Sequence, residues 1–305
     1  MVRFLLTRLL HGLAVVWVVI TLTFVFMRLA PGGPFDRERR LPPEVLANIA
    51  AKYHLDEPWL RQYGRYLLGI ARGDLGPSYK YVDRGVSDIV AETFPVSALL
   101  GVLALGFAVA FSFPLAISAA YYRNSWTDRS CLFLATLGIS LPHFILGAVL
   151  IWLFSLQLGW LQPGRWEDLT STVLPTITLG AAPAAYLSYL LRSSLVESLE
   201  EDYVRTARAK GLKEVTVLFK HALNNSLIPT LTVLGPLSAA LITGSFVVEY
   251  IFAIPGMGRF FITAVTDRDY PMIMGVTLVY TGLLVSANFF VDLLYSIVDP
   301  RIKSH

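Results

Sequence analysis

The stretch Tyr203-Val-Arg-Thr-Ala-Arg-Ala-Lys-Gly-Leu212, which continues to His221-Ala-Leu-Asn-Asn-Ser-Leu-Ile-Pro229, decides how this chain is organised. It is charged and helix-forming, and it lies between two long apolar segments. A chain made mostly of membrane spans has little use for a long basic insert unless a molecule on that side of the membrane binds it. The stretch therefore predicts a membrane pore that is driven by a separate soluble partner.

The composition supports the membrane part of this prediction. Hydrophobic residues make up 55% of the 305 residues and charged residues 15%, whereas soluble domains carry about 25% charged residues. The net charge of +3 is too small to suggest nucleic acid as a partner. Cys131 is the single cysteine, so the chain can form no internal disulfide and no thiolate cluster for a metal.

Six apolar stretches are each close to the roughly 20 residues that cross a hydrocarbon core, which predicts an all-α polytopic membrane protein. The first is too long for the apolar region of a signal peptide and is followed by a poor cleavage site, so we expect it to be retained. The predicted spans are 9–29, 96–121, 130–158, 173–191, 227–248 and 272–298.

The distribution of basic residues predicts the orientation of the spans. With the N-terminus inside, the inner segments hold twelve Lys and Arg residues and the two short outer loops hold three. Because positive charge is retained on the cytoplasmic side, both termini and the basic insert are expected to be cytoplasmic.

The outer segment between the first two spans has its own helical patterns. Pro42 opens one pattern that includes Tyr53, and Pro58 opens a second that Gly73-Asp-Leu-Gly76 ends. We expect either a small helical cap over the spans or a docking surface for an external partner, and one surface can serve both roles. The expected segments are an N-terminal span (1–30), this outer insert (31–93), a core of five further spans (94–294) and a cytoplasmic tail (295–305).

The basic stretch, here called the charged insert (residues 200–222), would be amphipathic as a helix. Val204, Ala207 and Gly211 would share one face, with Arg205 and Lys210 opposite. Glycine favours a break, so we expect two short helices that meet at an angle at Gly211. A basic amphipathic helix beside a membrane can also simply lie on anionic headgroups, which is the alternative to a coupling role.

The insert resembles the coupling loop of ABC importer permeases, and more narrowly that of the oligopeptide/dipeptide (peptide/nickel) branch. Gly211 falls in register with the glycine of the general importer loop, whereas Arg205-Thr206-Ala207 stands where that loop has Glu-Ala-Ala. His221 and Asn224 also depart from the general pattern, as is usual in the peptide branch. A salt bridge that depends on the general family's glutamate therefore does not transfer to this chain.

The resemblance extends along nearly the whole chain, and the long outer segment after the first span is similar to that of B-type oligopeptide permease subunits. The motifs that carry it are Met27-Arg-Leu-Ala-Pro-Gly32, Gln62-Tyr63, Gly73-Asp-Leu-Gly76, Phe94-Pro95, Ser140-Leu-Pro-His-Phe144, Gly244-Ser245, Val247-Val-Glu-Tyr-Ile-Phe252, Pro255-Gly-Met-Gly258, Arg268-Asp-Tyr-Pro271 and Asp299-Pro-Arg301.

The resemblance implies a type I ABC importer permease fold in a bacterial inner (plasma) membrane. The chain would pair with a second, homologous permease as a heterodimer, two cytoplasmic ABC ATPases would bind the coupling loops, and a periplasmic or lipid-anchored binding protein would deliver peptide. Dipeptides, glutathione and nickel chelates are alternative cargoes of the same branch. The residues expected to contact the ATPase are Arg205, Ala207, Arg208, Lys210, Gly211, Leu212 and Lys213.

One absence agrees with an energy source in another chain. The sequence contains no Gly-Lys pair, so it can form no G-x-x-x-x-G-K-[ST] phosphate loop. We therefore expect no cofactor in this chain, which is not itself an enzyme, and expect the partner ATPases to use ATP and Mg²⁺.

A second set of residues near the outer ends of the spans is expected to contact the periplasm or a partner. Glu249 is interpreted as an interface or loop-anchoring residue, and Asp292 as the partner of an inner basic residue or part of a hydrated site, although carboxylates within spans are often functional. The set comprises Glu249, Pro255, Gly256, Gly258, Asp269 and Tyr270.

Three other protein classes are compatible with a polytopic chain. An ATPase-independent channel or secondary transporter would be expected to show charged relays in mid-span or inverted repeats, and neither is clear here. A membrane enzyme would need a catalytic constellation, and Ser140 with His143 lacks the G-x-S-G sequence of an intramembrane serine protease. A purely structural scaffold would not need so many ordered permease motifs.

Overall fold

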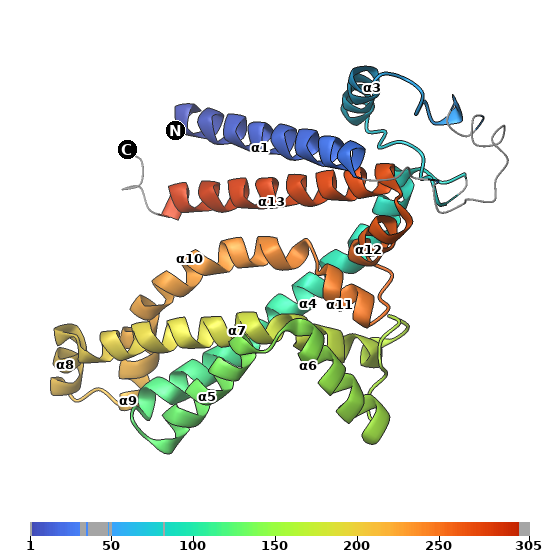
Figure 1. Ribbon diagram of the computed structural model, residues 1–305. Coiled ribbons are helices and arrows are strands. Elements are labelled where there is room, and N and C mark those ends of the chain that lie inside the picture. Colours follow the sequence, from blue (N-terminus) through green and yellow to red (C-terminus); the bar gives the residue numbers. More distant parts are fainter. Residues whose placement is uncertain (1, 31–34, 36–47, 49–50, 82, 299–305) are drawn as a thin grey trace. The chain divides into compact units, whose positions relative to one another are not determined.

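The computed structural model describes residues 2–30, 35, 48, 51–81 and 83–298 (Figure 1). Within these residues all named elements are helical, and the only β pairing is an isolated bridge between Pro77 and Gly85. The elements are α1 (Val2–Leu29), α3 (Trp59–Ala71), α4 (Val86–Tyr121), α5 (Trp126–Ser140), α6 (His143–Leu150), a π-helix η1 (Ile151–Gln157), α7 (Leu169–Glu200), α8 (Asp202–Ala209), α9 (Glu214–Thr216), a π-helix η2 (Val217–Ala222), α10 (Leu223–Ile242), α11 (Phe246–Ile251), α12 (Met257–Asp267) and α13 (Tyr270–Val298).

Five stretches of the described chain are long and apolar enough to cross a membrane. Many of their large apolar side chains are exposed, as lipid-facing side chains would be. The prediction of an all-α polytopic membrane protein is confirmed. The five stretches are Leu6–Leu29, Val86–Tyr121, Leu169–Glu200, Glu214–Ile251 and Tyr270–Phe290.

The third predicted span is not one continuous helix, which corrects that prediction. Helix α5 ends at Ser140, and the second half, α6 with η1, leaves at a bend of 109°. The cause is Pro142, which disfavours helical backbone at the residue before it. Leu141 accordingly takes an extended conformation. The described residues contain six candidate spans if this bent pair counts as one.

The fifth predicted span also breaks before its expected end at residue 248. Helix α10 ends at Ile242, and Gly244 has a φ of +86° before the short helix α11 begins at Phe246. The left-handed backbone that glycine adopts easily is what ends the helix there. The Ser245 side chain then caps α11 by accepting a hydrogen bond from the backbone N–H of Val248.

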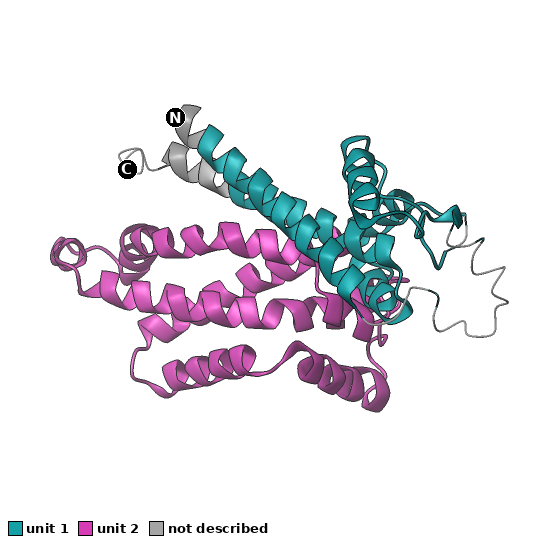
Figure 2. Cartoon of the chain, turned by 45° about the horizontal axis from the view of Figure 1, so that its top comes forward, with its two compact units in different colours: residues 1–96, 255–305 teal, residues 97–254 magenta. Residues whose placement is uncertain are grey.

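The chain divides into two compact units, residues 1–96 with 255–305 and residues 97–254 (Figure 2). This division follows contacts within the fold and differs from the four sequence segments expected above, which stay predictions. Each unit is described separately below.

The unit of residues 97–254 is built around α7. Leu187, Leu191 and Leu195 lie on one side of α7 and are fully buried. Leu187 belongs to a cluster with α4 and α10, and Leu195 to one with α4 and η2. Small residues allow the close packing, since a Cβ on Gly180 would lie 2.8 Å from the carbonyl oxygen of Ala104. The stretch Gly180-Ala-Ala-Pro-Ala-Ala185 therefore begins at a close helix–helix contact.

The unit of residues 1–96 and 255–305 pairs α1 with α13, which lie side by side (Figure 1). Helix α3 confirms the second helical pattern predicted for the outer segment, and Gly73 and Gly76 follow it with φ of +76° and +87°. The first pattern, which begins at Pro42, lies almost entirely outside the described residues.

Candidate functional site

The charged insert breaks at a glycine, as expected, but only the segment before the break, α8, is a short helix: after it, α9, η2 and α10 follow one another without a gap. Helix α8 ends at Ala209, and Gly211 then adopts a φ of +76°, a left-handed conformation that costs glycine little. The N–H of Gly211 donates to the carbonyl oxygen of Arg208 at 2.9 Å, and α9 begins three residues later at Glu214. The predicted break at Gly211 is confirmed.

The inner face of the insert is a small apolar core. Val204 and Ala207 of α8 pack with Val217 and Ala222 of η2, and Leu199 lies against this cluster. Ala207 is only 5% exposed. Its small side chain therefore packs the two segments of the insert together, which differs from the close-approach contact with a partner that we expected for it.

Hydroxyl groups tie this core to the end of α7. The Ser198 hydroxyl donates to the carbonyl oxygen of Ala222 at 3.0 Å and also shares a hydrogen bond with the Tyr203 hydroxyl. The Ser226 hydroxyl lies within 3.2 Å of the carbonyl oxygen of Ser194 and 2.8 Å of that of Ala222. Because these bonds join α7 to both ends of the insert, a displacement of the insert would be transmitted to α7.

The outer face of the insert is cationic around an apolar tip. Leu212 is 40% exposed, and the Arg205 side chain is 71% exposed although it pairs with Asp202. Arg208 spans the turn and pairs with Glu214 at 2.8 Å, which fixes α8 relative to the segment after the turn. Lys210 and Lys213, like Gly211, are also exposed.

This arrangement is suited to binding another macromolecule. It offers one exposed leucine and several cations on a turn that its own core and the Arg208–Glu214 pair hold in shape. No group of three or more metal-ligating side chains occurs in the described part of the chain, and the insert holds no catalytic constellation.

A family model described as the inner membrane component of binding-protein-dependent transport systems matches residues 112–304. A second model, for the N-terminal part of such membrane components, matches residues 1–101. The chain belongs to this family of inner-membrane transport components.

Two relatives are similar to this chain over essentially their whole length. The chain is 42% identical to an oligopeptide transport system permease protein of Haemophilus influenzae. The similarity extends over 99% of this chain and 100% of that protein. It is 46% identical to a dipeptide transport system permease protein of Bacillus subtilis over 100% of this chain and 99% of that protein.

Solved structures support the fold at much lower identity. An amino acid ABC transporter matches with a TM-score of 0.55 at 14% identity, over 68% of this chain and 93% of that one. An inward-facing methionine ABC transporter, MetNI, matches with a TM-score of 0.53 at 17% identity, over 69% and 96%. The type I ABC importer permease fold is thereby confirmed.

In this family member, Asp269 is an internal anchor. It is buried at the start of α13, where one carboxylate oxygen accepts from the backbone N–H groups of Tyr79 at 3.1 Å and Met272 at 3.3 Å. The other accepts from the Ser78 hydroxyl and from the N–H of Lys80 at 3.3 Å. These bonds cap α13 and hold the 78–80 turn against it.

The rest of the second predicted set is also mostly internal. Glu249, Gly256, Gly258 and Tyr270 are buried within the chain, and Pro255 is the one exposed member. Direct contact of this set with a partner stays a prediction, and Pro255 is the member whose exposure permits it without rearrangement.

The sequence interpretation missed a buried ion pair near the insert. Arg192 of α7 forms two parallel bonds with Asp128 of α5, at 2.6 and 2.7 Å. Asp128 also accepts from the N–H of Asn124 at 2.9 Å. The signal that could have found it is Ser125-x-x-Asp128, a helix-capping pattern that places an acidic side chain at the start of α5.

Proposed function

We propose that this chain is the peptide-translocating permease subunit of an ABC importer, with the charged insert as its contact to an ATPase. The names of the relatives support the substrate class, since both oligopeptide and dipeptide permeases are more than 40% identical to it. The twelve inner against three outer basic residues support cytoplasmic termini and a cytoplasmic insert.

The partners in this proposal are a second, homologous permease, two ATPases and an external peptide-binding protein. Because the chain lacks a phosphate loop, the ATPases use ATP and Mg²⁺. An acidic groove on an ATPase would complement the cations of the insert, and the exposed Leu212 would enter it.

The residues of this chain transmit movement in three steps. The groove moves the Gly211 turn, and the Arg208–Glu214 pair keeps the segments on either side of it together. The packed core and the Ser198 and Ser226 hydroxyls pass the movement to α7. Helix α7 then shifts as a body because its buried leucines pack it against α4 and α10.

The observation that carries the proposal is the exposed, left-handed turn at Gly211, which has open space around the glycine Cα. A Gly211→Trp variant would hold a bulky side chain where the groove must approach. We expect membrane insertion to persist and the ratio of peptide imported to ATP hydrolysed to fall at least tenfold in proteoliposomes.

Gly73 provides a matched control because it has the same φ of +76° and equally open surroundings, but lies after α3. Backbone strain alone would affect Gly73→Trp and Gly211→Trp equally. Wild-type coupling in Gly211→Trp, or an equal loss in both variants, would contradict the proposed role of the insert.

A dipeptide cargo is the second candidate, and the 46% identical dipeptide permease favours it. Binding-protein-dependent uptake of labelled peptides of two to five residues distinguishes the two substrate classes. Uptake that continues without ATPases would instead indicate a channel or secondary transporter.

A further inference from the structure

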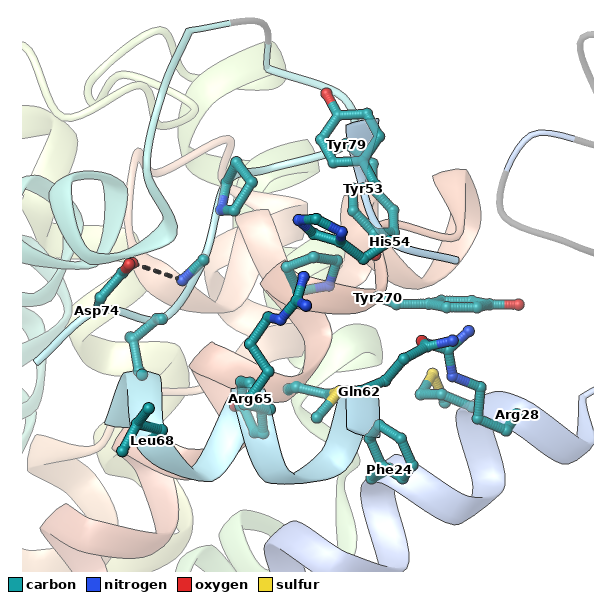
Figure 3. A pocket seen from close by; sticks show the side chains of 18 of the residues that line it. Phe24, Arg28, Tyr53, His54, Gln62, Arg65, Leu68, Asp74, Tyr79 and Tyr270 are labelled. Carbon is teal, nitrogen blue, oxygen red and sulfur yellow. Dashed lines mark hydrogen bonds between the residues drawn. The ribbon is translucent and has the colours of Figure 1, made fainter. Parts of the chain in front are cut away.

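A cavity of about 410 Å³ lies within the unit of residues 1–96 and 255–305 (Figure 3). Its wall is formed by the last turns of α1, one side of α3, the turn after α3 and the first turn of α13. This volume is in the range of pockets that hold small ligands or headgroups. The charged insert lies in the other unit, so the function proposed above does not use this cavity.

The cavity lies at the level of a membrane boundary. The candidate span in α1 has 24 residues, Leu6–Leu29, which at 1.5 Å per residue extends about 36 Å and so covers a hydrocarbon core. Its last turn contributes Arg28 to the wall, and α13, which lies beside α1, contributes its first residue, Tyr270. Arginine and tyrosine are typical of the boundary between hydrocarbon and headgroups.

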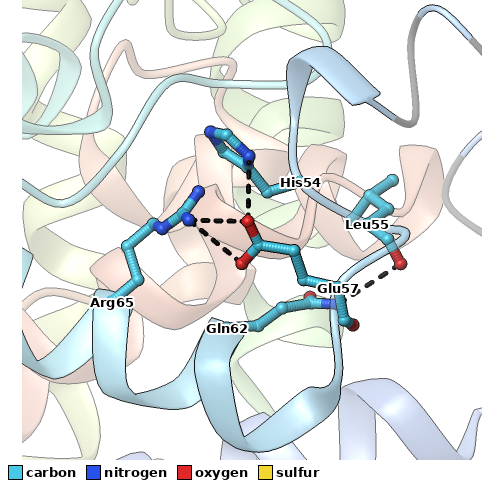
Figure 4. Close-up of polar contacts among 5 residues, drawn as sticks. All are labelled: His54, Leu55, Glu57, Gln62 and Arg65. Carbon is cyan, nitrogen blue, oxygen red and sulfur yellow. Dashed lines mark hydrogen bonds and ion pairs between the residues drawn. The ribbon is translucent and has the colours of Figure 1, made fainter.

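The wall carries an excess of positive charge. Arg28, Lys52, Arg65 and Arg72 line it, with Asp74 as the one carboxylate among the described lining residues. Asp74 accepts from the backbone N–H of Gly76 at 2.8 Å, which holds the turn. Arg65 is neutralised from outside the wall by both oxygens of Glu57, at 2.7 and 3.0 Å (Figure 4).

Arg28 is held in a fixed position. Its guanidinium lies 5.4 Å from the centre of the Phe24 ring and donates to the side-chain oxygen of Gln62. Gln62 is buried, and its amide in turn donates to the carbonyl oxygens of Glu57 at 2.7 Å and Leu55 at 3.3 Å (Figure 4). A guanidinium has five N–H donors, so an arginine fixed in this way can also bind an anion in the cavity.

Tyrosines add neutral donors to the wall. The Tyr66 hydroxyl is buried without a hydrogen-bond partner among the described residues, and burial raises its pKa. Burial likewise raises the pKa of Tyr79 to about 12. Both phenols stay protonated at neutral pH, so these tyrosines add no negative charge to the wall.

We propose that this cavity binds the phosphate headgroup of an anionic phospholipid, with Arg28 and Arg72 contacting the phosphate. The acyl chains would follow α1, whose last turns expose the large apolar side chains of Leu22, Val25, Phe26 and Leu29. A soluble anion would gain nothing from this apolar surface, so the geometry favours a lipid.

Native mass spectrometry of the full chain, extracted from bilayers with equal phosphatidylglycerol and phosphatidylcholine, tests this proposal. We expect retention of phosphatidylglycerol over phosphatidylcholine, and about a tenfold loss in Arg28→Gln from removal of a desolvated charge-assisted contact. Arg72→Gln, on an exposed position that is safe for folding, is expected to reduce retention in the same direction.

Arg61→Gln is the matched control, because Arg61 is exposed on the same helix as Arg65 but does not line the cavity. Equal retention of the two lipids, or an equal loss in Arg61→Gln, would overturn the proposal. So would tighter binding of inorganic phosphate or glycerol 3-phosphate than of phosphatidylglycerol, or displacement of the lipid by a tripeptide in an Arg28-dependent manner.

Discussion

Asp269 was expected from its sequence motif to contact a partner, whereas the structure shows it as an internal anchor. Its motif, Arg268-Asp-Tyr-Pro271, led to an expected contact with a partner, whereas the carboxylate is surrounded by donors from its own chain. An aspartate directly before an apolar helix could have been interpreted as an N-cap from sequence. The turn at Ser78, 191 positions earlier, could not, because only the folded chain brings the two together.

Replacing Asp269 by Asn should destabilise the unit that contains it by about 1–3 kcal/mol. The carboxylate accepts from the backbone N–H groups of Tyr79 and Lys80 through different oxygens. An asparagine replaces one of these oxygens with an NH₂ group, so at least one donor would then face another donor. Thermal unfolding in detergent measures the effect. Asp83→Asn is the control, since Asp83 is exposed with a φ of +59° that asparagine also tolerates; equal melting temperatures for both variants would contradict the anchor.

The Asp128–Arg192 pair is predicted to couple energetically. The side chains are 4% and 19% exposed, so removal of Arg192 leaves a carboxylate buried without its cation. Arg192→Gln should cost about 3–5 kcal/mol, and Asp128→Asn in the same chain should recover part of that loss. A double-mutant cycle of unfolding free energies in detergent checks this. Strict additivity of the two substitutions would show that the pair does not interact.

At the scale of helices, close packing depends on small residues at particular positions. A Cβ added to Gly101 of α4 would lie 2.2 Å from the carbonyl oxygen of Leu241 in α10, whereas a Cβ on Gly106 of the same helix meets nothing within 4 Å. Helix propensity favours alanine at both positions, so only the packing distinguishes them.

We therefore expect Gly101→Ala to lower the melting temperature and the yield of folded protein, and Gly106→Ala to leave both unchanged or slightly raised. The reason is that α10 must move away from α4 to admit a methyl group at 101. Size-exclusion profiles and melting curves of the two variants provide the comparison. An unaffected Gly101→Ala variant would show that the two helices do not pack this closely.

Sequence predicts the existence of the spans better than their shape. Length and hydropathy locate the helices, because a hydrocarbon core requires long apolar segments. The 109° bend before Pro142 was not expected from the sequence. A proline inside a helix and one that ends it leave the same sequence signature, and the choice depends on the helices packed around it.

At the scale of the whole chain, the charged insert was predictable in outline. Its charge and its break at Gly211 follow from residue type and spacing. The contact role of Leu212, which is exposed, was implied by the family resemblance. The burial of Ala207 agrees with the apolar face that it shares with Val204. The segment that covers this face, η2, does not follow from spacing, because it is brought there by a fold-back after Gly211. The hydroxyl contacts of Ser198 and Ser226 are equally invisible in sequence, since serines are common in spans.

The central claim is that an ATPase binds the insert at Leu212. Because Cys131 is the only native cysteine, a Cys131→Ser background allows one thiol to be placed at will. Cysteine at Leu212 should form a disulfide or short-linker cross-link with a cysteine in the groove of a co-expressed ATPase, and ATP should change its yield. Cysteine at the exposed Leu60 should not cross-link. No cross-link at Leu212, or equal yields at Leu212 and Leu60, would contradict the account.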